Sequence, residues 1–405
     1  MSEVIPYSRQ WISPEDVDAV ANQLQTPWLT QGPTVAEFET QLTAVTGAQY
    51  AVAVASGTAA LHLAALAAGV GPGKAGITSA ITFVASANCI AYAGGRPAFA
   101  DVNPSSGLID IADLERRCER LAREGSAPVV IIPVDFAGQA ADLPAVRGVA
   151  RKYDARVIED AAHALGASYR SDAGAVSCGS CADTDLAILS FHAVKQVTTG
   201  EGGAVLTNDR TVYTRLSELR THGITKDPSR LTRNDGPWYY EQQQLGYHYR
   251  ISDIQCALGV SQIRRLASFL ERRRALASRL DGALAQRPLA GCLRPLSTTP
   301  VTLQHAYHLY VVRVLRQSGE TLADVAERRK GLYAYLVSSD IHPQVHYIPV
   351  PRQPWFREHC ATRPEDFPGA EAYYAGCLSL PLFPAMQDSD MDRVIGALTA
   401  WANQL

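Results

Sequence analysis

The sequence predicts an α/β protein, with a large domain on a mostly parallel sheet and a smaller C-terminal α+β domain. Short apolar runs alternate with helix-like segments from about residue 50 to about residue 210. This alternation is typical of consecutive βαβ units with helices on both faces of the sheet. The chain of 405 residues is also too long for one ordinary hydrophobic core. We therefore expect a large domain over residues 1–255 and a small domain over residues 256–405.

Seven apolar runs are the expected strands of the large domain. They are Tyr50–Ala55, Gly76–Ser79, Pro97–Asp101, Val129–Val134, Arg156–Glu159, Leu186–Phe191 and Ala204–Thr207. Most of these runs are followed by polar or glycine-rich segments. Because ligands of open α/β sheets bind outside the carboxyl ends of the strands, we expect a binding site at that edge of the sheet.

The C-terminal part begins with an amphipathic helical pattern over Ile251–Leu284, whose arginine-rich face is expected to be solvated. We expect this helix to connect the two domains. A strand over Ala306–Val312, a helix over Thr321–Ser339, a strand over Gln344–Tyr347 and a helix over Ser389–Gln404 then complete the small domain.

The composition excludes several classes of protein. Hydrophobic residues make up 47% of the chain and charged residues 19%, as in a folded globular protein. A net charge of −3 gives no electrostatic support for a nucleic-acid or membrane-surface partner. The sequence shows no secretory leader and no apolar run of about 18 residues, so we expect a cytoplasmic protein without a membrane span. Its eight scattered cysteines are expected to be free thiols.

One cysteine pair, Cys178-Gly-Ser-Cys181, has the spacing found in zinc and redox sites. No second cysteine pair lies at this spacing in the sequence. We therefore expect no metal and interpret the segment as a reduced loop. A zinc-binding or redox role is the alternative.

A single lysine follows the sixth apolar run, in the segment Ser190-Phe-His192-Ala-Val-Lys195, and a glycine cluster follows at residues 200–203. This pattern predicts that Lys195 lies at the tip of a strand, in a tightly folded loop. A lysine amine becomes a useful nucleophile when burial or nearby positive charge lowers its pKa from about 10.4. Such a lysine typically forms a Schiff base, and pyridoxal phosphate (PLP) is the commonest carbonyl cofactor. The alternative is a surface lysine beside a hairpin.

A PLP site also needs an acid beside the pyridine nitrogen, to keep the ring protonated. The strand Arg156–Glu159 is followed at once by Asp160, which a parallel strand would deliver to the carboxyl edge of the sheet. The neighbouring Glu159 is expected to point to the opposite face. The alternative function for one of these two acids is to cap the next helix.

The remaining needs of PLP are a phosphate site and a flat group over the ring. Ser56-Gly57-Thr58 join the first strand to an alanine-rich helix, whose N-terminal N–H groups suit a phosphate. The same residue types also cap helices that bind no ligand. Phe83 is a candidate for stacking on the pyridine ring, with a core aromatic as the alternative.

Four segments occur together in one order. They are Ser56-Gly57-Thr58, Thr82-Phe83-Val84-Ala85, Glu159-Asp160-Ala-Ala-His163, and Ser190-Phe-His-Ala-Val-Lys195 with Gly200-Glu-Gly-Gly203. With these segments the chain resembles, over essentially its whole length, the PLP-dependent sugar aminotransferases of the DegT/DnrJ/EryC1 type. The resemblance implies the fold type I (aspartate aminotransferase-like) architecture. It also implies transamination, because relatives that act as dehydratases carry a histidine where this chain keeps Lys195.

The resemblance implies a role for each site residue. Lys195 and Asp160 are the expected catalytic residues, and His163 is expected to contact the cofactor ring or its 3′-oxygen. The full set of expected cofactor contacts is Ser56, Gly57, Thr58, Phe83, Asp160, His163, Ser190, Lys195 and His248. The expected substrate contacts are Gln31, His192, His308, His346 and Tyr347.

The resemblance also implies a homodimer whose active sites are completed across a two-fold interface. In relatives, an asparagine stands where this chain has His248, and it reaches from the partner subunit to the cofactor phosphate. A histidine can still donate a hydrogen bond from either ring nitrogen. We therefore expect His248 to bind the phosphate of the partner's cofactor.

Three further segments are similar to the pseudaminic acid branch of the family, namely Trp238–Arg250, Ile251–Gly259 and Gln344–Val350. This similarity implies transfer of an amino group from L-glutamate to C4 of a UDP-linked 4-keto-6-deoxy-N-acetylhexosamine. The implied product is UDP-4-amino-4,6-dideoxy-N-acetyl-β-L-altrosamine. The alternatives are an aminotransferase for another nucleotide-linked keto sugar and a PLP-binding regulator without turnover.

Overall fold

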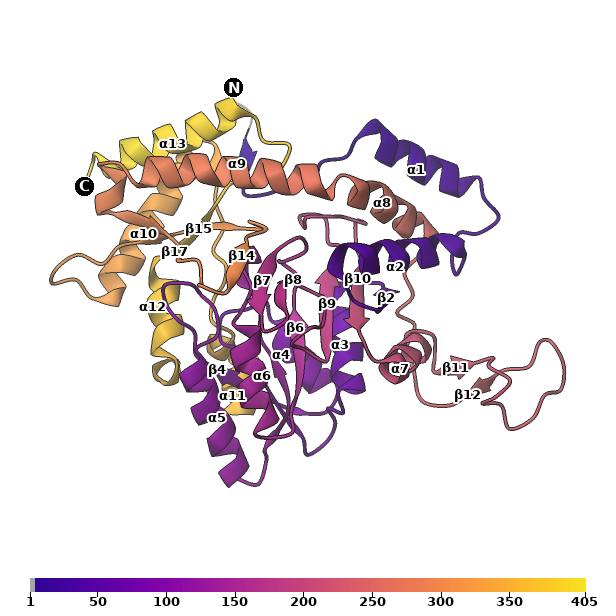
Figure 1. The fold of residues 1–405 in the computed structure, drawn as a ribbon. Coiled ribbons are helices and arrows are strands. Elements are labelled where there is room, and N and C mark those ends of the chain that lie inside the picture. Colours follow the sequence, from indigo (N-terminus) through magenta and orange to yellow (C-terminus); the bar gives the residue numbers. More distant parts are fainter. Residues whose placement is uncertain (1–3) are drawn as a thin grey trace.

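A seven-stranded sheet lies at the centre of the computed structural model, which describes residues 4–405 (Figure 1). All seven expected strands are confirmed, with ends within two residues of those expected. They are β2 (Tyr50–Val54), β3 (Ala75–Ser79), β4 (Arg96–Ala100), β5 (Pro128–Ile132), β6 (Arg156–Asp160), β9 (Leu186–Ser190) and β10 (Gly203–Thr207).

The strand order is β2-β10-β9-β6-β5-β3-β4. Strand β10 pairs antiparallel with both of its neighbours, and every other pair made by adjacent strands is parallel. The parallel strands therefore all end at the same edge of the sheet. This edge is where ligands are expected in such folds.

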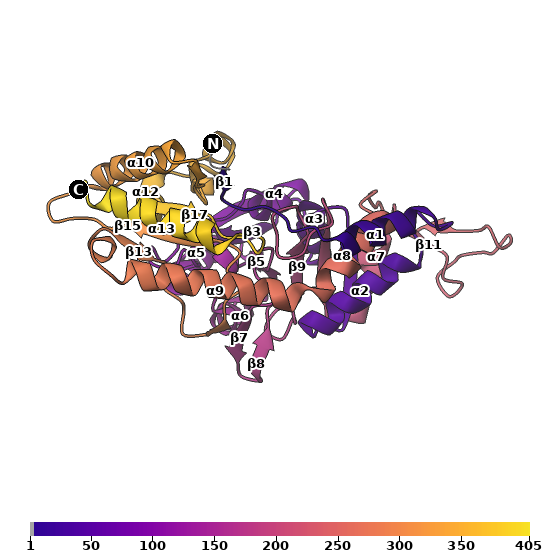
Figure 2. The same cartoon turned by 90° about the horizontal axis from the view of Figure 1, so that it is seen from above.

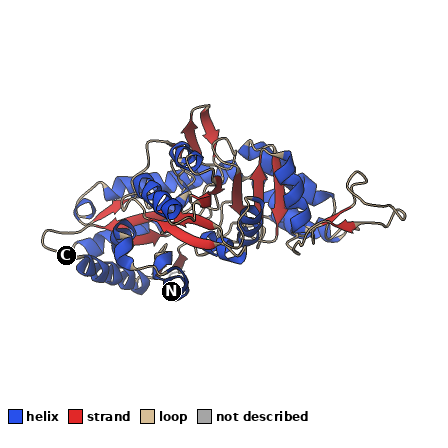
Figure 3. Cartoon of the chain, turned by 90° about the horizontal axis from the view of Figure 1, so that it is seen from below, coloured by secondary structure: helices blue, strands red, loops and turns tan. Residues whose placement is uncertain are grey.

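Helices cover both faces of this sheet, as Figure 3 shows from below. On one face, buried residues of the strands cluster with α3 (Gly57–Ala67), α4 (Ala85–Tyr92) and α7 (Arg210–Arg220). On the other face they cluster with α5 (Ile111–Arg123) and α6 (Leu143–Arg151), or with α2 (Pro33–Thr46) and α8 (Asp253–Arg264). In β9, for example, Ile188 belongs to the first face and Leu189 to the second, which is the two-residue period of a strand.

The expected helix over Ile251–Leu284 is in fact two helices, α8 and α9 (Leu266–Leu284), which divide at Arg265. The guanidinium of Arg265 binds Asp16, with Nη1 2.9 Å from Oδ2. It also stacks over the rings of Trp11 and Phe269, at 4.9 Å and 4.7 Å. The contacts with Asp16 of α1 (Pro14–Leu24) and with Trp11 in the loop before it stabilise the chain at this break. Helical periodicity in the sequence does not reveal such contacts.

The C-terminal part contains a three-stranded sheet of β13 (Leu293–Pro295), β15 (Tyr310–Val314) and β17 (Cys377–Leu380). A separate cluster of buried residues runs from Leu276 to Ala402 and includes Ile5. Helix α9 extends along this part of the molecule (Figure 1, Figure 2). The other helices here are α10 (Leu322–Ser338), α11 (Pro354–Cys360), α12 (Pro368–Gly376) and α13 (Asp388–Ala402). The domain boundary that we expect between residues 255 and 256 stays a proposal.

Two expected strands of the C-terminal part are corrected, whereas the helices expected at Thr321–Ser339 and Ser389–Gln404 are confirmed as α10 and α13. The strand expected over Ala306–Val312 begins only at Tyr310, because the residues before it bind the loop that follows β5. The segment Gln344–Tyr347 is not a strand, although Gln344 makes one bridge to Ser379. Instead, β16 (Ile341–His342) pairs in parallel with β1 (Ile5–Pro6).

The smaller elements complete the chain. A three-stranded sheet consists of β7 (Ser168–Ser171), β8 (Gly174–Ser177) and β14 (Thr302–Gln304). A second small pair is β11 (Ile224–Thr225) with β12 (Glu241–Gln242). Short 3-10 helices lie at Phe136–Gly138, Leu289–Gly291, Val350–Arg352 and Pro364–Asp366. Within residues 4–405, no helix is both long and apolar enough to cross a membrane.

Candidate active site

A cavity of about 460 Å³ opens at the carboxyl edge of the large sheet. It collects side chains that follow the ends of β2, β3, β6 and β9, together with side chains from two loops of the C-terminal part. Of the residues expected from the sequence, the cavity is lined by Ser56, Gly57, Thr58, Phe83, Asp160, His163, Ser190, His192, Lys195, His308, His346 and Tyr347. Residues far apart in the chain thus meet where the sequence predicts a site.

The start of α3 forms one wall of the cavity. Ser56 is the N-cap of α3, and its Oγ accepts a hydrogen bond from the Ala59 N–H at 3.1 Å. Gly57 is needed for close packing, because a Cβ at this position would lie 3.0 Å from the Cβ of Ser190. Gly203 is tighter still, since its Cβ would lie 2.5 Å from the Ser56 carbonyl oxygen. Capping by Ser56 and a phosphate site are therefore compatible here, because the first residues of α3 line the cavity and the first N–H groups of a helix have no partner within it.

Asp160 ends β6 and is buried at the base of the cavity. Its Oδ2 accepts a hydrogen bond from the Ser86 hydroxyl at 2.6 Å, and its Oδ1 accepts one from the Ala162 N–H at 3.2 Å. The net effect is a raised pKa for this carboxyl, because burial raises it more than the two hydrogen bonds and the charge of Lys195 lower it. Both oxygens are thus held in place by neighbours that favour the ionised form.

Lys195 lies in the loop between β9 and β10, and its backbone N–H donates to the His192 carbonyl at 2.9 Å. Its amine faces the cavity but is otherwise enclosed by protein. Burial lowers the pKa of this amine to about 8, against the opposing effect of Asp160. The structure therefore supports the expectation of an activated lysine over that of a surface lysine.

Three histidines surround Lys195. The Nε2 of His308 lies 3.5 Å from the lysine Nζ, and the rings of His163 and His308 are 4.4 Å apart. His163 Nε2 lies 3.3 Å from the Tyr347 hydroxyl. Burial and the Lys195 charge lower the pKa of all three, for His346 to about 4. At neutral pH these imidazoles are therefore uncharged.

Phe83 is not a core residue, because 56% of its surface is exposed. It lines the cavity near Tyr347, with their ring centroids 6.2 Å apart. A large aromatic ring at the mouth of a cavity is well placed to contact a planar ligand. His192 lies near the same opening, and its Nε2 is 4.0 Å from an oxygen of Glu201.

The cavity residues that were not expected from the sequence include Tyr7, Ser86 and Glu201. Ser86 could have been suspected, because it is polar and follows Phe83 by three residues. Glu201 lies in the glycine cluster after Lys195. Tyr7 had no local signal, since pairing of β1 with the distant β16 brings the N-terminal segment here.

Two expected site residues, Gln31 and His248, lie outside this cavity in the single chain. Gln31 lines a separate cavity together with Arg220 and Arg250. His248 is exposed, and its Nε2 lies 2.7 Å from Nη2 of Arg250. Their expected contacts with substrate and cofactor are therefore not made within one copy of the chain.

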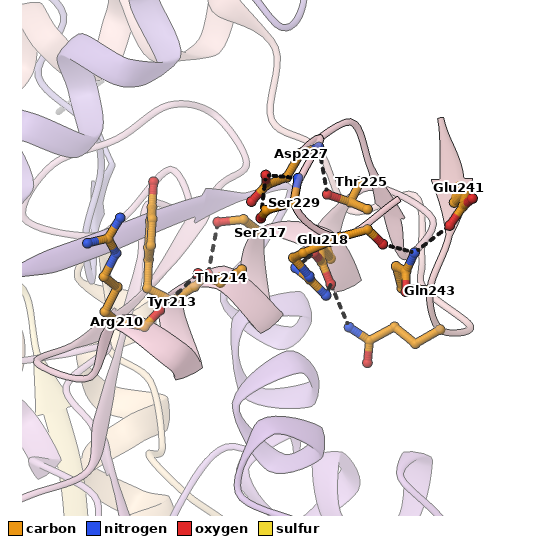
Figure 4. Close-up of polar contacts among 12 residues, drawn as sticks. Arg210, Tyr213, Thr214, Ser217, Glu218, Thr225, Asp227, Ser229, Glu241 and Gln243 are labelled. Carbon is orange, nitrogen blue, oxygen red and sulfur yellow. Dashed lines mark hydrogen bonds and ion pairs between the residues drawn. The ribbon is translucent and has the colours of Figure 1, made fainter. Parts of the chain in front are cut away.

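His248 follows a segment that projects from the body of the molecule between β11 and β12 (Figure 1). The base of this segment is anchored to α7, as Figure 4 shows. There Gln244 donates to Oε2 of Glu218 at 3.3 Å, and Arg230 forms an ion pair with the same carboxylate. Beyond this anchor, Trp238 and Leu245 are 72% and 81% exposed.

A second group of acids lies behind the site. Glu159 points away from Asp160, as expected from strand alternation, and its Oε1 accepts from the Gly179 N–H at 2.9 Å. Ligand atoms of Asp135, Glu159 and Cys178 all lie within 4.8 Å of one another, and the three residues are buried. Burial raises the pKa of both carboxyls, and the nearby charge of Asp135 raises that of Glu159 further.

The remaining oxygens of these two acids, Asp135 Oδ2 and Glu159 Oε2, have no other partner within residues 4–405. We interpret Asp135 and Glu159 as two carboxyl groups that share one proton. All eight cysteines, including Cys178 and Cys181, are free thiols. The CxxC segment thus contributes one thiol to an acid cluster, and Cys181 is not part of that group.

Comparison with known proteins identifies the chain. A model of the DegT/DnrJ/EryC1/StrS aminotransferase family matches residues 10–399. The chain belongs to this family. It is a PLP-dependent sugar aminotransferase with the fold type I architecture.

This aminotransferase is similar to proteins of known sequence and structure along its whole length. It is 37% identical to the spore coat polysaccharide biosynthesis protein SpsC of Bacillus subtilis, over 97% of this chain and 96% of SpsC. It superposes on Helicobacter pylori PseC, an aminotransferase of pseudaminic acid biosynthesis, with a TM-score of 0.87 and 26% identity, over 100% of both chains. The PLP form of the Streptococcus pneumoniae sugar aminotransferase Spr1654 matches with a TM-score of 0.86 and 28% identity, over 99% of both chains.

The cavity of this aminotransferase fits PLP by its own chemistry. It offers N–H groups at the start of α3 for a phosphate, an anchored carboxylate at Asp160 for a ring nitrogen, and the amine of Lys195 for an aldehyde. The Nδ1 of His163 is a buried polar atom that has no partner in the described chain. When bound, PLP supplies the electron sink that lets a bond at the amino-acid Cα break.

Proposed function

We propose that this aminotransferase moves an amino group from L-glutamate to C4 of a UDP-linked 4-keto-6-deoxy-N-acetylhexosamine. The product would be UDP-4-amino-4,6-dideoxy-N-acetyl-β-L-altrosamine, for pseudaminic acid biosynthesis. The observation that carries the transfer itself is the meeting of Lys195, Asp160 and the start of α3 in one cavity. The similarity to PseC over the full length of both chains supports the choice of sugar.

In this proposal Lys195 binds the cofactor covalently and later moves a proton at its Nζ as general base and acid. Its pKa of about 8 suits that task, because an effective proton-transfer group has a pKa near the working pH. Asp160 keeps the cofactor ring nitrogen protonated. Ser56, Gly57, Thr58 and Ser190 hold the phosphate end, Phe83 covers the ring, and His163 contacts the ring or its 3′-oxygen.

The substrate contacts in this proposal are His192, His308, His346 and Tyr347, which line the cavity, and Gln31. Gln31 and His248 would reach the site of a second copy of the chain in a homodimer. Two exposed apolar side chains support such a contact, Trp238 of the projecting segment and Leu245 after β12, because exposed large apolar side chains often mark an interface. The free cysteines support a cytoplasmic location.

A second candidate is transamination of a different nucleotide-linked keto sugar, with another nucleotide or with the ketone at C3. The similarity to SpsC supports it, because SpsC is a protein of spore coat polysaccharide biosynthesis and is 37% identical to this chain. The regulator without turnover is not retained, because the chain belongs to an aminotransferase family and the similar solved structures are sugar aminotransferases.

A substrate panel distinguishes the two candidates. The purified enzyme is incubated with glutamate and single nucleotide keto sugars that vary in nucleotide and in ketone position, and the products are identified by mass spectrometry. We expect the UDP-linked 4-keto-6-deoxy-N-acetylhexosamine to give the highest kcat/KM. A higher kcat/KM for a dTDP-linked or 3-keto sugar would contradict the first candidate and support the second.

A further inference from the structure

His308 is buried against the amine of Lys195. Only 3% of its surface is exposed, and its Nε2 lies 3.5 Å from the lysine Nζ. Its Nδ1 has no hydrogen-bond partner in the described chain. The lysine amine is therefore the polar group that this imidazole meets. In ligand-free enzymes the donor–acceptor distances between catalytic groups are often long, and they shorten when the ligand binds.

The backbone on one side of His308 is fixed by the loop after β5. The Ala306 N–H donates to the Gly138 carbonyl at 2.8 Å, and the Leu309 N–H donates to the Ala137 carbonyl at 3.2 Å. Gly138 allows this approach, because a Cβ there would lie 2.9 Å from the His308 nitrogen. Its φ of +100° also lies in the region that favours glycine.

A buried arginine fixes the same backbone from the side of α9. Nη1 of Arg273 donates to the carbonyl oxygens of Tyr307 at 3.1 Å, His308 at 3.3 Å and Leu382 at 3.0 Å. Burial lowers the pKa of this guanidinium to about 10, so it keeps its charge at neutral pH. Burial of a charged guanidinium costs free energy, which its hydrogen bonds to three carbonyl oxygens offset. These hydrogen bonds also fix the backbone position of His308.

The imidazole of His308 is uncharged in this setting. The groups that face it are the amine of Lys195, the guanidinium of Arg273 and the rings of His163 and His346, and each of them lowers its pKa, as does burial. No carboxylate is among the groups that act on it. An uncharged imidazole with a fixed backbone can accept a hydrogen bond from an ammonium group without repelling it.

We propose that His308 is a positioning residue for Lys195. Its Nε2 accepts a hydrogen bond from the lysine amine whenever that amine is not covalently bound, and so holds it ready for proton transfer. This proposal rests on the proposed role of Lys195. It adds to the substrate contact assigned to His308 above, and it explains why a loop of the C-terminal part is fixed so firmly beside the lysine.

The first test measures the Lys195 amine in the cofactor-free protein. Trace acetylation with acetic anhydride at a series of pH values, followed by mass spectrometry of the Lys195 peptide, gives the pH midpoint of its reactivity. We expect His308→Leu to lower this midpoint by about one pH unit, because the ammonium form loses a hydrogen-bond acceptor. His308→Gln, whose amide oxygen is an acceptor, should keep the midpoint of the parent protein.

The matched control is His305→Gln. His305 is a half-buried histidine on the same segment, and its Nδ1 accepts from the Tyr307 N–H at 2.8 Å, outside the cavity. It should leave the midpoint unchanged. If His305→Gln shifted the midpoint as much as His308→Leu, or if His308→Gln shifted it equally, the effect would come from packing and the proposal would be wrong.

The second test uses the PLP-loaded enzyme in a single turnover with glutamate, followed by absorbance. We expect His308→Leu to retain bound PLP but to slow the turnover about 100-fold, because a misplaced proton-transfer group costs about this much. Normal transamination by Lys195→Ala would overturn the role of Lys195 and this proposal with it. An unchanged midpoint and turnover rate in His308→Leu, with Lys195→Ala inactive, would overturn the positioning role alone.

Discussion

At the scale of single residues, the site depends on how burial and hydrogen bonds set charge. Asp160 is buried, yet it accepts hydrogen bonds from Ser86 and Ala162 that favour its ionised form. Burial lowers the pKa of Lys195 to about 8, although the charge of Asp160 opposes this shift. One carboxylate and one reactive amine therefore result from ordinary residue types in different surroundings.

Replacing Asp160 with asparagine should lower kcat by about 100-fold or more, because the charge that keeps the cofactor ring nitrogen protonated is lost. Ser86→Ala is the graded comparison, and it should cost about tenfold, because one hydrogen bond to a charged group is lost. Circular dichroism should show both variants folded. Near-normal kcat in folded Asp160→Asn would mean that another residue holds the nitrogen.

The buried pair of Asp135 and Glu159 should make stability depend on pH. Burial raises the pKa of both groups, that of Asp135 to about 6, so the folded chain binds protons more tightly than the unfolded chain. The contribution of this pair to stability is therefore fully present below the unfolded-state pKa of about 4. It is lost as the pH rises through the folded-state pKa.

Glu159→Gln removes one titrating group but keeps a hydrogen donor for Asp135. Its melting temperature should consequently fall less between about pH 5 and about pH 8 than that of the parent protein. The measurement is differential scanning calorimetry across this range. An equal fall in both proteins would show that the pair does not share a proton.

At the scale of elements, prediction from the sequence succeeded where a local pattern decides the structure. The seven strands of the large sheet have strong apolar runs, and all were found. Prediction failed where distant contacts decide it. Residues 306–309 are not a strand because they bind Gly138, and the helix predicted over Ile251–Leu284 breaks because Arg265 binds Asp16. Tyr7 in the cavity, likewise, depends on pairing of β1 with β16.

The close packing of β10 against the start of α3 should be essential for cofactor binding. In Gly203→Ala the new Cβ would lie 2.5 Å from the Ser56 carbonyl oxygen, so the first turn of α3 must shift. We expect a loss of about 1–3 kcal/mol in stability and weaker retention of PLP. Gly282→Ala in α9 is the control, because a Cβ there meets no atom within 4 Å, and it should be neutral or slightly stabilising. Equal PLP retention in the two variants would contradict this account of the α3 wall.

At the scale of the whole molecule, the site is assembled from both ends of the chain but lacks two of its expected residues. Gln31 and His248 lie outside the cavity in one copy. No local pattern in the sequence predicts on which copy a residue acts, because that depends on a surface that one chain does not contain. A homodimer with shared sites would supply both residues.

Mixed dimers test this arrangement. His248→Ala should weaken PLP retention about tenfold through loss of a hydrogen bond to the phosphate, whereas His248→Asn should be nearly silent. Mixing Lys195→Ala chains with His248→Ala chains should restore activity, because one site per mixed dimer combines Lys195 from one chain with His248 from the other. If mixing restores nothing, and His248→Ala retains PLP as the parent protein does, the residue does not act across an interface.

Lys195 is the residue that we expect to bind PLP covalently. The direct measurement is reduction of the yellow holoenzyme with borohydride, digestion, and mass spectrometry of the peptides. We predict a single cofactor-derived mass increase on the peptide that contains Lys195, and no such increase and no turnover in Lys195→Ala. A label on a different lysine, or normal transamination by Lys195→Ala, would contradict the account.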